Sequence, residues 1–102
     1  MSKNELITVF GRLGKDPELR YTRSQKAVCN FTLAETVEGQ DAPLWHQVVT
    51  WEKQAERCPV NLSKGDPVIV RGHIREHEFT GRDGILRQVR ELHAEFLGVS
   101  IA

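Results

Sequence analysis

Three aromatic side chains in this sequence have the type and spacing needed to stack on the bases of a nucleic acid. Trp45 and Trp51 would share one face of an extended strand, roughly 20 Å apart at about 3.3 Å per residue. Phe79 stands shortly before the turn sequence Gly81–Gly84. Each base that stacks on an aromatic ring contributes about 1–3 kcal/mol by alanine substitution. We therefore predict base contacts at all three rings, with burial in the core or in an oligomer interface as the alternative for the two tryptophans.

Basic residues that could contact phosphate accompany these rings. They are Arg12, Arg20, Lys53, Lys64, Arg71, Arg75 and Arg82. Alternating polarity places Arg71 and Arg75 on the outer face of one predicted strand. Single-strand binders combine such cations with aromatic rings, and their affinity falls steeply with salt. The alternative for any one of these cations is a solvated position paired with a nearby carboxylate such as Glu91.

Catalytic and metal-binding patterns are absent from the sequence. His73 and His77 would share a strand face but lie roughly 13 Å apart, and no spacing of His, Cys or Asp fits zinc. There is no nucleophile elbow and no phosphate-binding glycine loop. We therefore predict a non-enzymatic protein without cofactor or metal. His46 faces away from Trp45 and is predicted at a subunit interface or in a polar core contact.

Size and composition indicate one small domain. The chain has 102 residues, of which 39% are hydrophobic and 27% charged, and we expect a single domain over residues 1–102. Its net charge of zero counts against a strongly basic nucleic-acid binder, although basic residues outnumber acidic ones over residues 1–34. Cys29 and Cys58 are expected to be buried, reduced thiols. Without a membrane-length apolar run or a signal peptide, a cytoplasmic location is expected.

Strand patterns alternate with turn signals along most of the sequence. The predicted strands are 6–10 with a short extension at 19–22, then 27–35, 44–51, 68–75 and 85–99, the last bent or bulged. Gly11 and Gly14 are predicted to end the first strand. Residues 52–57 are compatible with a short helix that breaks or restarts at Pro59. Five main strands with a helix between the third and the fourth is the order of an all-β OB-fold, a small Greek-key barrel, and another small barrel or sandwich is the rival.

Five sequence blocks occur in an order that resembles the bacterial single-stranded DNA-binding protein family. They are Gly11–Tyr21, Asn30–Ala34, Trp45–Val49, Lys64–Gly72 and Asp83–Gly84. The resemblance covers nearly the whole chain. It implies an OB-fold that assembles into a tetramer, or a dimer of two-OB chains, and binds single-stranded DNA in replication, repair and recombination. It also implies stacking at the three aromatic residues and phosphate contacts from Arg20, Lys53 and Lys64.

The sequence departs from this family pattern in two places. Family members usually carry a long tail whose acidic end recruits other replication proteins, whereas this sequence ends at Ala102, directly after the last predicted strand. We therefore do not expect recruitment through a tail. The family often has an aromatic residue in the loop after the second strand, where this sequence has Glu38-Gly39-Gln40. The expected partner is single-stranded DNA, bound at the nucleoid by a homotetramer or dimer with no membrane association.

Another OB-fold family provides an alternative function. The chain is also similar to primosomal replication protein N, a tailless dimer that acts mainly as a protein-interaction platform during replication restart. The absent tail and the zero net charge favour this alternative, whereas aromatic residues at three family positions favour DNA binding. A small nuclease is supported only by scattered histidines and glutamates. Oligomeric state separates the first two, because a tetramer supports the DNA-binding protein and a dimer the accessory protein.

Overall fold

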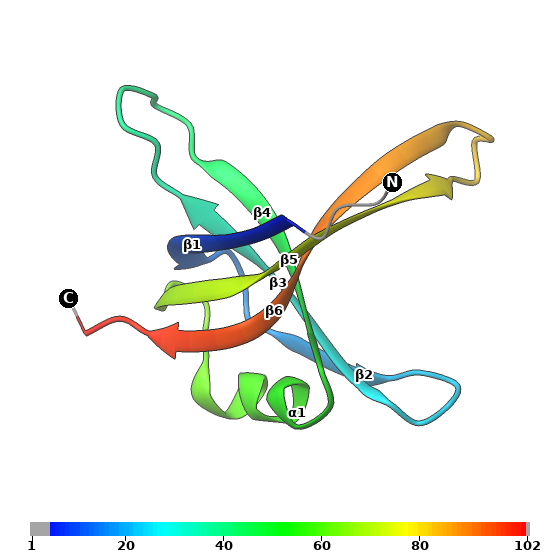
Figure 1. The fold of residues 1–102 in the computed structure, drawn as a ribbon, viewed down its shortest axis with the longest axis horizontal. Coiled ribbons are helices and arrows are strands. Elements are labelled where there is room, and N and C mark those ends of the chain that lie inside the picture. The colour runs from blue at the N-terminus through cyan, green and yellow to red at the C-terminus, as the bar shows by residue number, and fades with distance from the viewer. Residues whose placement is uncertain (1–4, 102) are drawn as a thin grey trace.

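The computed structural model describes residues 5–101, which form six strands and one helix (Figure 1). The elements are β1 (Glu5–Leu13), β2 (Glu18–Tyr21), β3 (Ala27–Glu35), β4 (Leu44–Trp51), α1 (Glu52–Asn61), β5 (Pro67–Thr80) and β6 (Leu86–Val99). The helix leads from β4 to β5, as the sequence predicts. No helix in this part of the chain is long and apolar enough to cross a membrane.

The strands close into a barrel. Hydrogen bonding runs in the order β1-β5-β6-β4-β3, and β3 pairs again with β1. All of these neighbours are antiparallel except β4 and β6, which pair in parallel. The short strand β2 pairs with β3 just beyond the residues that pair with β1. It corresponds to the predicted extension of the first strand, but it is a separate strand. The predicted OB-fold is confirmed, with six strands in place of five main ones.

Gly11 lies inside β1, so the prediction that it ends the first strand is wrong. The strand continues to Leu13 and pairs with β3 at Arg12 and Leu13. A Cβ atom at Gly11 would lie 2.7 Å from the carbonyl oxygen of Ala34. Only glycine permits this approach of the two backbones. The residue therefore serves barrel closure instead of a turn.

The core follows the alternation of the strands. On β3, the side chains of Cys29, Phe31 and Leu33 are buried, as predicted, and on β5 Val68 and Val70 are fully enclosed. The thiols of Cys29 and Cys58 are free and buried, which confirms their predicted state. Burial raises the pKa of Cys29 to about 12, with the neighbouring Cys58 adding to the effect. These thiols are therefore structural side chains of the core.

The helix α1 runs through Pro59 without a break, so the predicted interruption is wrong. Pro59 lies in the last turn, where the missing N–H removes one hydrogen bond and the helix ends two residues later. The backbone N–H of Leu62 donates to the carbonyl of Cys58 at 2.8 Å and closes this end. Ala55 and Cys58 are buried and hold the helix against the barrel. Packing thus offsets the loss at Pro59.

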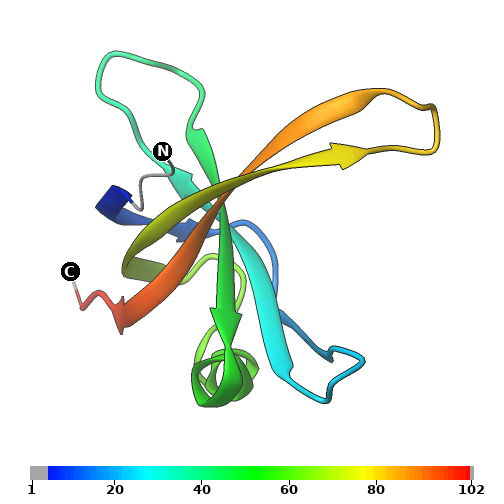
Figure 2. The ribbon, with the colours of Figure 1, turned by 45° about the vertical axis from the view of Figure 1, so that its right-hand side comes forward.

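Three projections extend from the barrel (Figures 1 and 2). They are the β2–β3 hairpin, the β3–β4 loop and a long arm formed by the ends of β5 and β6. The predicted irregularity in the last strand is confirmed, because Arg71 pairs with Phe96 whereas Gly72 pairs with Ala94, which leaves Glu95 as a bulge. Bulges sharpen the local twist of a strand pair. The arm starts beyond this bulge, where β5 and β6 continue as a two-stranded ribbon.

Candidate nucleic-acid interface

The outer face of β4 carries both tryptophans. Trp45 is 54% exposed and Trp51 is 39% exposed, so neither indole fills the core. Val49, between them on the same face, is buried. The strand therefore presents two separate rings to solvent, which is the arrangement that stacking of unpaired bases requires.

The indole of Trp45 lies over the loop after β1. A Cβ atom at Gly14 would lie 2.6 Å from Cζ3 of this ring, so the ring rests directly on the glycine backbone. Gly14 belongs to the Gly11–Tyr21 block and directly follows the last residue of β1. The block thus supplies the support under one candidate stacking residue, and any larger residue at Gly14 would displace the indole.

Trp51 stands at the junction of β4 and α1. Its backbone is extended and caps the helix without a side-chain hydrogen bond. The ring borders an open depression of about 590 Å³ whose lining includes Tyr21 and Lys53. The hydroxyl of Tyr21 donates to a carboxylate oxygen of Glu56 at 3.3 Å. The exposed rings of Trp51 and Tyr21 and the cation of Lys53 therefore line one concave site.

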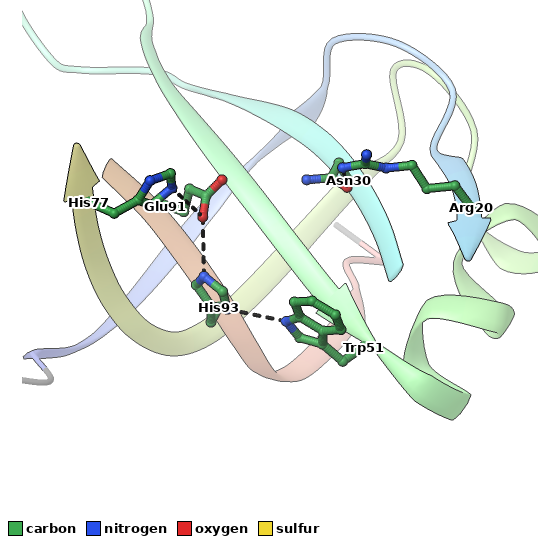
Figure 3. A network of polar contacts seen from close by, with 6 residues as sticks. All are labelled: Arg20, Asn30, Trp51, His77, Glu91 and His93. Carbon is green, nitrogen blue, oxygen red and sulfur yellow. Dashed lines mark hydrogen bonds and ion pairs between the residues drawn. The ribbon is translucent and has the colours of Figure 1, made fainter. Parts of the chain in front are cut away.

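Arg20 lies on the strand row that leads to Trp51. Arg20 is opposite Val28 on β3, and Val28 is in turn opposite Trp51 on β4. The guanidinium donates to Oδ1 of Asn30 at 3.1 Å, across the outer face of the same strands (Figure 3). This hydrogen bond uses one of its five N–H groups, which leaves others directed at solvent or phosphate.

The β5–β6 arm presents Phe79 on a face that also carries charged side chains. Phe79 is 54% exposed and lies opposite Arg87 on β6. Strand alternation puts Arg75 and His77 on this face, whereas Glu76 and Glu78 point to the other. Arg82 lies in the turn at the tip. Glu91 lies on the same face as Phe79, opposite Arg75, so this face carries acidic as well as basic side chains.

One carboxylate does lie at the tip of the arm. Asp83 pairs with Arg87, with 2.7 Å between Oδ2 and Nη2. The guanidinium, together with the backbone N–H of Ile85, holds the pKa of Asp83 below its ordinary value. Asp83 therefore stays ionised at neutral pH and neutralises part of the charge of Arg87.

Among the other predicted phosphate contacts, Arg12 lies on the strand row that leads to Trp45, because it is opposite Ala34, which is in turn opposite Trp45. Arg12 donates to the carbonyl of Gly65 at 3.0 Å, next to Lys64. The backbone N–H of Lys64 donates to a carboxylate oxygen of Asp16 at 2.8 Å. These two cations thus occupy the loop junction where β1 ends. Arg71 has Thr8 and Phe96 as its cross-strand neighbours and belongs to a different part of the surface from Trp51.

His46 faces away from Trp45, as predicted, and is half-buried at the start of β4. Its Nε2 lies 2.9 Å from Oε1 of Glu35 on β3. This contact occupies the ring within one chain. A role at a subunit interface stays a prediction.

Two residues beside Trp51 escape the sequence analysis, Tyr21 and His93. Nε1 of Trp51 donates to Nδ1 of His93 at 3.3 Å, across the β4–β6 pair (Figure 3). Tyr21 ends the recognised Gly11–Tyr21 block, so its ring could have been proposed for stacking. His93 carries no such signal, because its neighbourhood depends on the pairing of distant strands. Among residues 5–101 no group of three or more His, Cys, Asp or Glu could hold a metal ion.

Comparison with known proteins identifies the family. The model of the single-strand binding protein family matches residues 4–100. The chain is 37% identical over 101 residues to the single-stranded DNA-binding protein of Neisseria meningitidis, covering 92% of this chain and 58% of that protein. It is 36% identical over 110 residues to the single-stranded DNA-binding protein of Paenarthrobacter aurescens, and the match covers 99% of this chain and 64% of that protein. The chain thus spans about three-fifths of the length of these relatives.

Family membership agrees with the prediction of a protein without enzymatic activity, because members bind DNA and catalyse no reaction. It also agrees with an oligomer, since the family is generally oligomeric. The family model matches residues 4–100, which include the whole barrel and both exposed indoles of β4. The chain belongs to the single-strand binding protein family.

Proposed function

We propose that this chain binds single-stranded DNA with little sequence preference, during replication, repair and recombination. The observation that carries the proposal is the outer face of β4, where Trp45 and Trp51 are exposed beside Arg20 and Lys53. Aromatic rings accept any base, because every base has a π face, and cations follow the backbone. In this proposal residues 1–102 act as one OB-fold domain in the cytoplasm, at the nucleoid.

A strand bound in this way would follow β4 and then the arm. Bases would stack on Trp45 and Trp51, with Phe79 as a third exposed ring on the arm. Phosphates would meet Arg20, Lys53 and Arg75 along this line. Arg12, Lys64 and Arg82 would serve segments of DNA that pass the loops and the tip. Arg71 is not placed on this path, because its cross-strand neighbour Phe96 lies on the outer face that is proposed below for self-association.

The test is quenching of tryptophan fluorescence by poly(dT), followed by reversal with salt. Stacking on either exposed indole should quench emission at low salt. Each neutralised phosphate should contribute a slope of about −0.7 to the plot of log affinity against log salt concentration. A double-stranded DNA of equal length serves as the control and should quench far less. Absence of quenching by poly(dT) at low salt would refute the proposal.

Self-association is the second part of the proposed function. Between Glu5 and Gly11, β1 pairs with β5 alone among the described strands, so its other edge is open. Apolar side chains lie beside this edge on the outer face of β1, β5 and β6, namely Leu6, Phe10, Ile69 and Phe96, which are 37–58% exposed. Open edges and contiguous apolar surface favour pairing with another chain. We infer a homotetramer built on this face.

Replacement of Phe10 by Asp should weaken this assembly. Phe10 is 50% exposed and lies opposite Ile69, so the change places a charge in the proposed interface without opening the core. We expect a loss of about 2 kcal/mol or more, roughly a 30-fold rise in the dissociation constant. Multi-angle light scattering over a dilution series measures it. Val60→Asp, at an 81% exposed position of α1, is the matched control and should leave the mass unchanged.

Light scattering of the wild-type chain also distinguishes the two candidate functions, DNA binding and an accessory role in replication restart. A wild-type tetramer that dissociates on Phe10→Asp supports the proposed assembly. A wild-type dimer would favour the accessory role of a primosomal protein. An unchanged mass for Phe10→Asp would contradict the assignment of this face.

A further inference from the structure

We propose that His93 is a positioning residue for Trp51, and that it acts only in its neutral form with the proton on Nε2. The inference deepens the proposed function and rests on it, because the orientation of the indole affects binding only if a base stacks there. Three observations carry it: a hydrogen bond with one allowed direction, near-parallel ring planes, and a carboxylate that fixes the tautomer.

The direction of the hydrogen bonds determines the tautomer. Nε1 of Trp51 lies 3.3 Å from Nδ1 of His93, and an indole nitrogen can only donate. Nδ1 must therefore be an acceptor without a proton. The proton of the neutral ring is then on Nε2, which lies 3.3 Å from Oε1 of Glu91 and donates to it. Nε2 of His77 approaches the same carboxylate oxygen at 3.4 Å (Figure 3).

This chain of contacts restricts the plane of the indole. The ring centroids of Trp51 and His93 lie 6.4 Å apart and their planes differ by 18°. His93 is held by the parallel pairing of Val49 on β4 with its own backbone on β6. An indole that is oriented before DNA arrives incurs less ordering cost on binding. The two rings also form a platform that reaches from β4 to β6.

A second proton on His93 would remove the acceptor. Both ring nitrogens would then carry hydrogen, and Nδ1–H would face the indole N–H, so that two donors meet. Histidine side chains gain this charge between about pH 5 and 8. The hydrogen bond to Trp51 therefore requires the neutral form of His93 and is lost when the ring takes up a second proton. The positive charge would by itself attract phosphate, so the two effects oppose each other in the wild-type chain.

Several ionisable groups surround His93. On β6 they are Glu91 and Glu95, on β5 they are His73, Arg75 and His77, and at the start of α1 they are Glu52 and Lys53. The paired segment of β4 contributes Val49 and Trp51, which carry no charge. Because His73 and His77 are also imidazoles on the neighbouring strand, the pH profile of the wild-type chain alone does not isolate His93. Variants at His93 and a signal specific to Trp51 are needed.

The first measurement uses chains with a single tryptophan and no DNA. Trp45→Phe leaves Trp51 as the only indole, and Trp51→Phe leaves Trp45 as the matched control. Between pH 8 and pH 5 we expect a change in Trp51 emission that is absent from the control chain. His93→Gln in the Trp45→Phe chain should abolish the change, since an amide oxygen accepts the indole N–H without titrating. A transition that survives His93→Gln, or no transition at all, would overturn the proposal.

The second measurement is affinity for oligo(dT) at pH 8, in chains with both tryptophans. His93→Leu removes the acceptor and should weaken binding about 3- to 10-fold, the equivalent of one neutral hydrogen bond. His93→Gln should bind within about 2-fold of wild type, which a merely steric role would not predict. Equal affinity of wild type and His93→Leu would refute a positioning role. Failure of every chain to bind would refute DNA binding itself, and with it this role, while the fluorescence transition would still report the hydrogen bond.

Discussion

Replacement of Trp45 and Trp51 together by alanine should reduce affinity for poly(dT) by about 30-fold or more. Each single replacement should cost about 1–3 kcal/mol, which corresponds to roughly 5- to 150-fold in the dissociation constant. The reason is that both rings are exposed on the outer face of β4, so their removal deletes stacking surface without opening the core. Fluorescence polarisation of labelled oligo(dT) measures the effect, since the double variant has no tryptophan signal of its own.

The control for this result lies on the same strand. Leu44 is 52% exposed and directly precedes Trp45, on the opposite face of β4. Leu44→Ala removes a similar exposed apolar side chain and should change the binding free energy by less than about 0.5 kcal/mol. If Leu44→Ala weakens binding as much as either tryptophan variant, general disturbance of the strand, and not loss of stacking, is the cause.

Replacement of Gly72 by alanine should lower the free energy of unfolding by about 1–3 kcal/mol, the usual cost of overpacking. A Cβ atom at Gly72 would overlap the carbonyl oxygen of His93, which is backbone and has no room to move aside. The position lies beside the bulge at Glu95, where β5 and β6 change register. Relief of the clash must separate these two strands. Urea unfolding at one fixed protein concentration measures the loss, because self-association also affects stability.

Gly98 offers a control in the same pair of strands. A Cβ atom there would lie 3.3 Å from the ring of Phe96, an exposed side chain that can move. Gly98→Ala should therefore change stability by only about 0.5 kcal/mol. Equal losses for the two variants would show that the cost comes from alanine in this sheet generally. Because Gly72 faces the backbone of His93, its replacement should also disturb the hydrogen bond from Trp51.

Much of the barrel could be predicted from local pattern. Cys29, Phe31 and Leu33 alternate with less buried residues along 29–34, and β3 has the predicted bounds of 27–35. The glycine at position 11 shows where such inference fails. A glycine at a turn and a glycine at a close backbone approach look alike in sequence, and only the contact with Ala34 distinguishes them. Pro59 misleads in the same way, because packing of the helix is not visible locally.

The sequence likewise predicts some parts of the candidate site and not others. Exposure of Trp45 and Trp51 follows from residue type and strand period, so the sequence points to both. The contact between Trp51 and His93 does not follow, because it requires the parallel pairing of β4 with β6. Which strands become neighbours depends on closure of the whole barrel. Arg71 and Arg75 have different cross-strand neighbours for a similar reason, since the register of β5 and β6 shifts between Arg71 and Gly72.

The short parallel contact between β4 and β6 has a mechanical consequence. Only two residue pairs, Val48 with Leu92 and Val49 with His93, join these strands, and β1 meets β3 over an equally short stretch. The barrel is therefore two sheets joined along two narrow seams. A nucleotide that covers Trp51 and His93 together would contact both β4 and β6, and so would link the two sheets where they meet. Occupation of the site would then slow the parting of the two sheets, and the barrel would open least readily while it holds its ligand.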